Sequence, residues 1–385
     1  MRLPTPDAVA GAARARDRKC RRRLGEKDFV SGPGAHFGCT DREMNVDKQD
    51  VGTRRMSRIN KATRWASALM AAGAAGAMPV AHAEIELGKG FSIAGFLDMS
   101  YSNFSPDEGS STESIGIDQF ETTFKYAGSQ GVSAQVDIEY GEGFDGSDDE
   151  TFVEQAFVTK AFTEQFSVKV GRFLSYSGWE TEEPTGLFQF SGTGYAKYFY
   201  GFYQNGASAF YGGSKFALMG SVVTSPFNPN DRNSVEDVDD KMGYEVGLAL
   251  MPADGLTAKA FFISDQDTDT DVVNVWASYA AAGFTFAGEF NTVEYGASSA
   301  VVDGDGDGFL LMGNYATGPL GFTVRYHDFE IQTASGATAD DGSAITLAPS
   351  YKVGDNLLLV FEYRMDESDT NGDSDTVAVE ALFTF

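Results

Sequence analysis

The residues of this chain best suited to chemistry are carboxylates in a short repeat with glycine. Asp303-Gly304-Asp305-Gly306-Asp307-Gly308 matches the first half of a calcium loop, in which alternate carboxylates converge on a hard cation and glycine allows the turn. The twelfth position is Asn314 instead of glutamate, and no helix is expected beside it, so a complete EF-hand is rejected. We expect Asp303, Asp305 and Asp307 to lie in a solvated external loop, with weak Ca2+ or Mg2+ binding as the second interpretation. No other cofactor is expected.

A second concentration of carboxylates lies in the longest segment without a regular pattern, residues 175–205. A Leu187-Phe188-Gln189-Phe190 run and a stretch rich in Tyr, Phe and Gly follow them in the same segment. Exposing so many rings to water would be unfavourable, so we expect the segment to be buried. Packing at a subunit interface is the alternative. Its candidate functional residues are Trp179, Glu180, Glu182 and Glu183.

Around that segment, the chain after residue 83 alternates apolar and other residues with period two, which indicates strands with two different faces. In Leu357, Leu359, Phe361, Tyr363 and Met365, for example, one face is continuously apolar. Most segments run for ten to thirteen residues, near the ~9–11 that a tilted membrane strand needs and longer than is usual in a soluble sandwich. Sixteen strands are predicted, with fourteen or eighteen left open, over residues 89–103, 114–126, 131–141, 151–161, 165–174, 206–212, 216–225, 242–251, 255–265, 272–281, 284–295, 308–317, 320–332, 343–353, 356–367 and 374–385.

The connections between these strands also alternate, short turns with longer acidic loops. This asymmetry is typical of an all-β transmembrane antiparallel up-and-down β-barrel, with short periplasmic turns and long external loops. The last nine residues, Val377–Phe385, form one more alternating strand and end on an aromatic carboxy-terminus. Such an ending resembles the terminal insertion signal of Gram-negative outer-membrane proteins.

In a barrel of this kind, the polar face of each strand lines the lumen. Residues 175–205 would then fold inward, and their carboxylates would face the charged residues of the wall. Opposed acidic and basic arcs would set a transverse field across the opening, whereas scattered charges in a wide pore are the alternative. The charged residues whose register points inward are Lys169, Arg325, Arg364, Glu121, Glu139, Glu289 and Glu380.

Residues 56–83 have the three parts of a secretory signal peptide. Arg58, Lys61 and Arg64 precede an apolar stretch, and Ala81-His82-Ala83 forms a cleavage site. Residues 1–55 would be an upstream extension, either disordered or the result of a translation start placed too early. Without residues 1–83 the chain keeps 13 Lys and Arg against 48 Asp and Glu, a net charge of −35, and no cysteine. Such a charge excludes nucleic acid as a partner and favours cations.

The run from Val170-Gly171-Arg172-Phe173 through Gly178-Trp179-Glu180 resembles the OmpL-like family of putative β-barrel porins. The resemblance extends in layout to most of residues 84–385. It implies an outer-membrane barrel with a constriction loop after strand five, and a homotrimer.

These features predict an outer-membrane porin that lets small hydrophilic solutes and ions diffuse through the lumen, with a preference for cations. Its other partners would be membrane lipid and lipopolysaccharide. No enzymatic activity is expected, because the one histidine after residue 83, His327, points inward beside Arg325, whereas acyl chemistry on lipids needs Ser and His facing the bilayer. The competing hypothesis is a non-conducting structural or adhesive barrel whose acidic loops bind divalent cations.

Overall fold

The structure is a computed structural model that describes residues 84–385 apart from 142–150, 181, 228–240, 297–298 and 300–301. All of the described residues lie within one unit of the chain. The upstream extension predicted over residues 1–55 and the signal peptide predicted over residues 56–83 lie outside the described residues.

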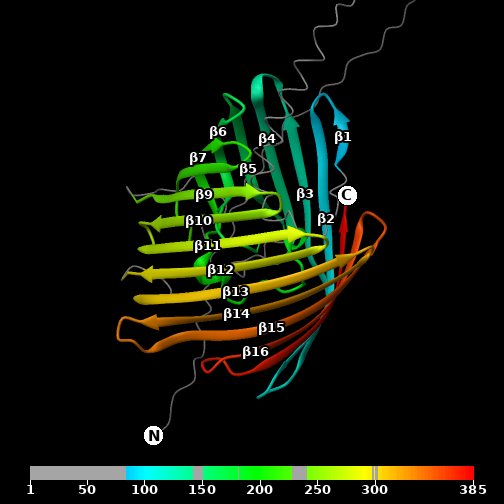
Figure 1. Cartoon of the computed structure of the whole chain (residues 1–385), viewed down its shortest axis with the longest axis vertical. Coiled ribbons are helices and arrows are strands. Elements are labelled where there is room, and N and C mark those ends of the chain that lie inside the picture. Colours follow the sequence, from blue (N-terminus) through cyan, green and yellow to red (C-terminus); the bar gives the residue numbers. More distant parts are fainter. Residues whose placement is uncertain (1–83, 142–150, 181, 228–240, 297–298, 300–301) are drawn as a thin grey trace, which may run out of the picture. The chain divides into compact units, whose positions relative to one another are not determined.

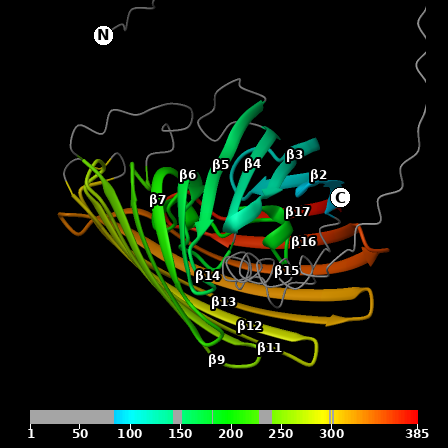
Figure 2. The same ribbon diagram turned by 90° about the horizontal axis from the view of Figure 1, so that it is seen from above.

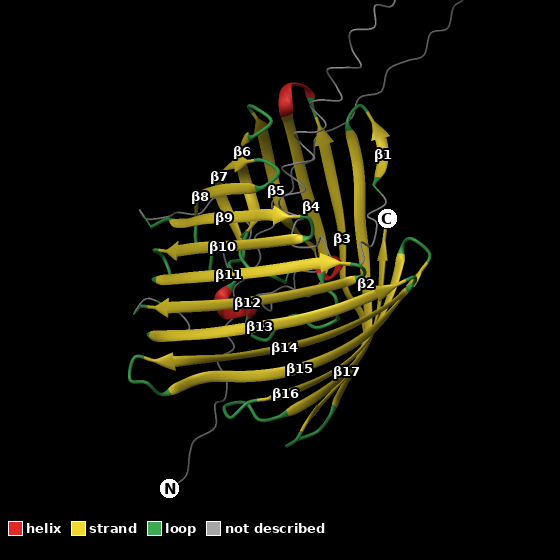
Figure 3. Cartoon of the chain, in the orientation of Figure 1, coloured by secondary structure: helices red, strands yellow, loops and turns green. Residues whose placement is uncertain are grey.

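Strands dominate the described part of the chain, and each of the sixteen predicted segments corresponds to one of them (Figure 3). Within the described residues, helical structure is limited to η2 (Ser129–Gly131), η3 (Pro184–Gly186) and α2 (Ala196–Phe199). None of the described helices is both long and apolar enough to cross a membrane. The strands are β1 (Ile85–Gly88), β2 (Phe91–Pro106), β3 (Thr112–Ala127), β4 (Val132–Gly141), β5 (Thr151–Ala161), β6 (Phe166–Leu174), β7 (Tyr203–Gly212), β8 (Phe216–Val223), β9 (Gly243–Ala253), β10 (Leu256–Asp265), β11 (Thr270–Ala281), β12 (Phe284–Tyr295), β13 (Gly304–Thr317), β14 (Leu320–Thr333), β15 (Thr338–Val353), β16 (Leu357–Glu367) and β17 (Ser374–Thr384).

Strands β2–β17 form one closed antiparallel barrel of sixteen strands (Figures 1 and 2). Each strand pairs with the next one in sequence, and β17 pairs with β2 from Ser374↔Pro106 to Thr384↔Phe96, which closes the ring. Closure leaves no sheet edge with unpaired backbone groups in the ring, as a barrel in a lipid bilayer requires.

Side chains alternate between the two faces of the barrel wall as the period-two pattern predicts. Along β11, Val273 and Val275 face outward and are exposed, whereas Val272, Asn274 and Trp276 face inward and are buried. The outer surface is therefore apolar, and the polar residues of the same strands are turned toward the lumen.

The external loop expected around Asp303–Gly308 is shorter than predicted, because β13 begins at Gly304 instead of residue 308. Asp305 and Asp307 are consecutive outward-facing residues of that strand and, like Asp303, are exposed. Residues two apart on a strand lie about 7 Å from each other, so these carboxylates do not converge as they would in a calcium loop. The short strand β1, which pairs with β2, was not predicted.

The aromatic carboxy-terminus lies inside the β-ladder. Phe385 and Gly95 exchange two backbone hydrogen bonds of 2.9 Å, and the Phe385 ring lies 6.4 Å from the Phe120 ring. A Cβ atom on Gly95 would lie 2.6 Å from the Phe385 ring, so glycine makes room for the terminal ring there. The last residue of the chain thus completes the seam at which the barrel closes.

Candidate functional site

The segment between β6 and β7, Ser175–Phe202, lies inside the barrel, and we call it the inward loop. Its aromatic residues Trp179, Tyr195, Phe199 and Tyr200 are buried. They form one apolar cluster with inward-facing residues of β10–β14, among them Ile263, Val272, Trp276, Leu310 and Ile331. Burying these rings against an apolar stretch of the wall stabilises the loop in the lumen, since each large side chain removed from water contributes about 1.5–3 kcal/mol.

Glu289 on β12 is the main polar anchor of the inward loop. Its carboxylate accepts hydrogen bonds from the Trp179 backbone N–H at 2.7 Å and from the Tyr195 hydroxyl at 2.7 Å. The Tyr200 hydroxyl and the Asn274 side chain donate to it as well. Four donors thus satisfy one buried carboxylate, three of them from the loop, so Glu289 fixes where the loop crosses the lumen.

Arg325 on β14 is the second anchor. Its Nη1 donates to both carboxylate oxygens of Glu180, at 2.8 and 3.0 Å, and to the Ser191 carbonyl at 2.7 Å. Both charged side chains are buried. We expected Glu180 and Arg325 to face each other as part of a field across the opening. Instead the loop carries Glu180 to the wall of Arg325, where the two charges neutralise each other.

Further hydrogen bonds fasten the inward loop around the barrel, to β3, β11, β14 and β16. The Thr323 hydroxyl donates to the Phe188 carbonyl at 2.9 Å, and Arg364 Nη1 donates to the Gly192 carbonyl at 2.9 Å. The remaining ties are Gly178 N–H to Asn274, Ser191 N–H to Glu362 and Gln119 Nε2 to Glu183. These bonds join the inward loop to strands on several sides of the barrel.

Buried carboxylates line the lumen on six neighbouring strands of the described chain, and we call a set of six, one from each strand, the acidic arc. Glu121 and Glu139 are direct register partners on β3 and β4, so two like charges stand side by side. All six are buried by the wall and the loop. In strand order, the members of the acidic arc are Glu362 on β16, Glu380 on β17, Asp98 on β2, Glu121 on β3, Glu139 on β4 and Glu154 on β5.

Glu183 of the inward loop approaches this arc. Oxygen atoms of Glu121, Glu154 and Glu183 lie within 4.8 Å of one another, a spacing at which three carboxylates can share protons or hold a hard cation. Tyr203 donates to Glu183 at 3.3 Å. Withdrawal from water, and next the charges of Glu154 and Glu121, raise the pKa of Glu183 well above its usual value near 4.5.

The other predicted site residues are also placed inside. Lys169 on β6 is buried among aromatic rings, with its ammonium 4.3 Å from the centre of the Phe157 ring, a cation–π arrangement. Glu182 is half-buried in the inward loop. His327 is buried on the lumen side of β14, edge-on to Tyr195.

Three members of the acidic arc were not among the predicted site residues: Asp98, Glu154 and Glu362. The alternation along β2 and β16 would have pointed Asp98 and Glu362 inward. Glu154 is the residue of β5 without a register partner at the irregularity between Asp137 and Ile138 of β4, where the facing of residues along β5 shifts. The alternation of residues along β5 therefore does not by itself predict which face of the wall Glu154 lies on.

Acidic side chains outnumber basic ones on the buried inner surface of the described residues. Eleven Asp and Glu are buried there, against two Arg and one Lys. Of these acids, Glu180 is neutralised by Arg325, whereas Glu289 accepts hydrogen bonds from neutral donors. The rest of the lumen keeps a strong negative excess, which attracts cations.

A protein-family model described as Gram-negative porin matches residues 66–371 of the chain. Among solved structures, the Salmonella typhi OmpF complex with daunomycin is similar, with a TM-score of 0.59 and 15% identity, over 78% of this chain and 100% of the other. The anion-selective porin from Comamonas acidovorans has a TM-score of 0.58 and 14% identity, over 77% and 99%. The in-vitro folded trimer form of OmpT from Vibrio cholerae has a TM-score of 0.54 and 14% identity, over 77% and 100%. A comparison with curated proteins finds no match.

Proposed function

This chain belongs to the Gram-negative porin family, and from that premise we propose that it is a cation-preferring diffusion channel narrowed by the inward loop. As a porin it is a protein of the outer membrane and a channel for solutes. The proposal adds a direction of ion preference and a constriction. The chemistry of a porin is passive, so its residues act by shape and charge.

The acidic arc is the observation that carries the preference for cations. The apolar residues of the inward loop pack against β10–β14, whereas the acidic arc lies on β16, β17 and β2–β5, the other part of the wall. A ring segment of carboxylates with low-dielectric walls concentrates cations and repels anions. Arg325 does not oppose this field, because its charge is compensated by Glu180.

The anchors of the inward loop support its role as the constriction. Glu289 and Arg325 bind loop residues from two different strands, and the aromatic cluster holds the loop on the same side. A loop held by buried charge-assisted bonds stays at one height in the lumen, so it limits solute size in a constant way.

Current measurements across planar lipid bilayers test the proposed function. With a salt gradient of KCl across the bilayer, we expect stable conductance steps and a reversal potential whose sign shows that K+ crosses more readily than Cl−. A reversal potential favouring Cl− would contradict the preference for cations. Silent bilayers, with folded protein present, would favour the non-conducting structural or adhesive barrel instead.

Three further features extend this proposal. Export through a signal peptide at residues 56–83 would bring the barrel to the outer membrane, and peptide sequencing of the mature amino-terminus tests it. A homotrimer is supported by the similar fold of the OmpT trimer form, and cross-linking in detergent tests it. Weak binding of Ca2+ or Mg2+ at the acidic external loops is the third expectation, which titration calorimetry tests.

A further inference from the structure

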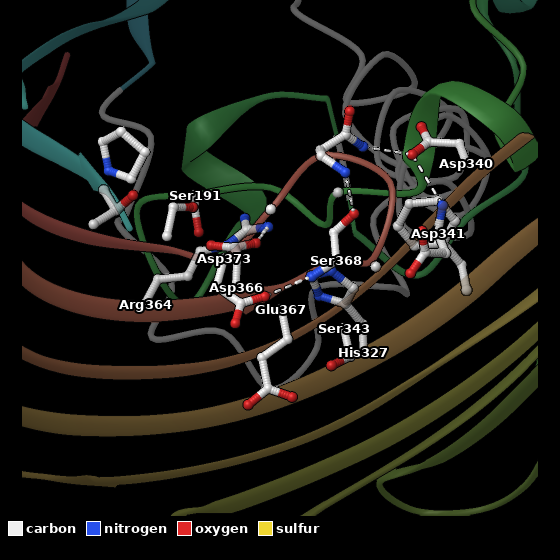
Figure 4. Close-up of a pocket in the computed structure, with 18 of the residues that line it drawn as sticks. Ser191, His327, Asp340, Asp341, Ser343, Arg364, Asp366, Glu367, Ser368 and Asp373 are labelled. Atoms are coloured by element: carbon white, nitrogen blue, oxygen red, sulfur yellow. Dashed lines mark hydrogen bonds and ion pairs between the residues drawn. The ribbon is translucent and has the colours of Figure 1, made fainter. Parts of the chain in front are cut away.

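A cavity of about 390 Å3 lies between the inward loop and the ends of β14–β17 that carry the longer connections (Figure 4). Side chains of both charges line it, including Arg364, Asp340, Asp366 and Asp373. Enclosed spaces of this size with a few converging polar groups are typical of small-molecule sites. The proposed function gives this cavity no role of its own.

The basic side of the cavity is built around Gly194 of the inward loop. A Cβ atom on Gly194 would lie 3.3 Å from Arg364 Nη2 and 3.3 Å from His327 Nε2, so both nitrogen atoms converge on the space that glycine leaves free. Arg364 Nε donates to Asp366 at 2.8 and 2.9 Å, Nη2 donates to the same carboxylate at 2.5 Å, and Nη1 donates to the Gly192 carbonyl, so one N–H on Nη1 and one on Nη2 are not used by these bonds. Since a guanidinium has five N–H groups, Arg364 keeps donors for a further acceptor.

The acidic side of the cavity is held in place by the connection between β16 and β17. The backbone N–H groups of Asp369 and Thr370 each donate to Asp341 at 3.0 Å. Asp340 pairs with Lys197 at 3.3 Å and accepts a hydrogen bond from Asn371 at 2.7 Å. The lining carries five carboxylates, Asp340, Asp341, Asp366, Glu367 and Asp373, against the two cations Lys197 and Arg364.

We infer that this cavity is a capture site for small zwitterions that carry a carboxylate and an ammonium group, such as free amino acids and short peptides. The ligand carboxylate would accept from Arg364 and His327 beside Gly194, and its ammonium would face the surplus carboxylates. The inference deepens the proposed function, on which it rests, by naming a class of solute that the channel concentrates at its mouth.

Ligands with a single charge fit this lining less well. A simple anion meets a net charge of −3 without a positive group to balance it. A simple cation gives no acceptor to the remaining N–H of Arg364 Nη2 or to His327 Nε2 beside Gly194, because the bond from Nη2 to Asp366 uses only one of its two N–H groups. A zwitterion satisfies both sides at once.

Calorimetric titration of the purified full-length protein in detergent tests the ligand class with three matched probes. Alanyl-alanine carries both charges, N-acetyl-alanyl-alanine only the negative one, and alanyl-alanine amide only the positive one. We expect the zwitterion to bind at least about tenfold more tightly than either analogue, because each analogue loses one set of charge-assisted bonds. Equal binding of the amide, equal binding of the acetylated peptide, or no binding of alanyl-alanine would each overturn the inference.

Two variants place the binding in this cavity. Gly194→Ala fills the space beside Arg364 and His327, and Arg364→Gln removes the guanidinium, so both should weaken alanyl-alanine binding about tenfold or more. Gly192→Ala is the matched control in the same loop, because its Cβ would meet no atom within 4 Å, and it should bind like the wild type. Heat-modifiable gel mobility verifies that each barrel is folded. Unchanged binding in both cavity variants would overturn the site.

The reversal potential of the same preparation separates the two proposals. Preference for K+ without dipeptide binding would refute the capture site alone. Dipeptide binding without preference for K+ would refute the proposed ion preference alone.

Discussion

Arg325 on β14 and Glu180 in the inward loop are 145 residues apart in the sequence and form a buried ion pair inside the barrel. The Nη1 atom of Arg325 bonds both oxygens of Glu180, and the Thr193 backbone N–H donates to the same carboxylate at 2.7 Å. Each charge is thus compensated only while the loop lies against the wall. The pair acts as a fastener of the constriction and contributes little to a field across it.

Replacing Arg325 with methionine should release the inward loop. Glu180 would remain buried without a counter-charge, which costs about 3–5 kcal/mol. We expect a larger and noisier single-channel conductance in planar bilayers than in the wild type. The double variant Arg325→Met with Glu180→Leu removes both charges. Its single-channel conductance and current noise should return most of the way to the wild-type values. A single variant with wild-type conductance would show that the pair does not hold the loop.

Replacing Glu289 with glutamine should loosen the loop at its other anchor. The amide has one acceptor oxygen in place of two and turns an NH2 group toward the donors Tyr195, Tyr200 and Trp179 N–H. Losing charge-assisted bonds of this kind costs about 1.5–3 kcal/mol each. Hydrogen exchange of the backbone amides in Ser175–Phe202 should therefore become faster. Glu294→Gln, an exposed change on the outer face of the same strand, is the matched control. Equal exchange in both variants would argue against the anchor.

The barrel could be predicted because its alternation depends on each strand alone. A residue on a strand faces lipid or lumen according to its parity, so sixteen segments with one apolar face already specify sixteen strands of a barrel. The family resemblance noted from the segment around Gly178-Trp179-Glu180 is confirmed by the family match. The features that were not predicted are local, such as β1 and the earlier start of β13. At that start Asp305 and Asp307 alternate with glycines, so the pattern has no apolar face that would indicate a strand.

The candidate site could be predicted less well, because its contacts join distant parts of the chain. The odd or even position of a residue along its strand predicted that Arg325 and Glu289 face the lumen. It contains no information on where a long loop folds. The structure brings Glu180 to Arg325 and Glu183 to Glu121, and only the second meeting joins like charges. An electric field predicted only from the charged residues of the barrel wall therefore leaves out Glu180 and Glu183, which the loop places beside them.

Neutralising two members of the acidic arc should reduce the preference for cations. Glu121 and Glu139 are adjacent on β3 and β4, so the double variant Glu121→Gln with Glu139→Gln removes two neighbouring charges of the arc with little change in volume. We expect the reversal potential in a KCl gradient to move toward zero, since fewer fixed charges concentrate K+. Glu164→Gln, in the exposed turn between β5 and β6, should leave it unchanged. A wild-type reversal potential in the double variant would remove the arc from the permeation path.

The raised pKa of Glu183 predicts a pH-dependent channel. Withdrawal from water and the charges of Glu154 and Glu121 keep Glu183 protonated at pH values above its usual pKa near 4.5. The folded state therefore binds this proton more tightly than the unfolded state. The contribution of this proton to the stability of the folded state is fully present at pH values below the usual pKa. It is lost as the pH rises through the raised pKa of Glu183. Over the same window the constriction gains negative charge, so the preference for K+ should increase with pH.

Reversal potentials measured from acidic to alkaline pH test this dependence. Glu183→Gln should flatten the curve of reversal potential against pH, because the amide does not titrate. At pH values above the raised pKa of Glu183, the variant should also be more stable than the wild type. Glu108→Gln, an exposed change in the connection between β2 and β3, is the control and should keep the wild-type curve. A curve that stays equally steep in Glu183→Gln would assign the titration to other carboxylates of the lumen, and Glu183 would then have no part in it.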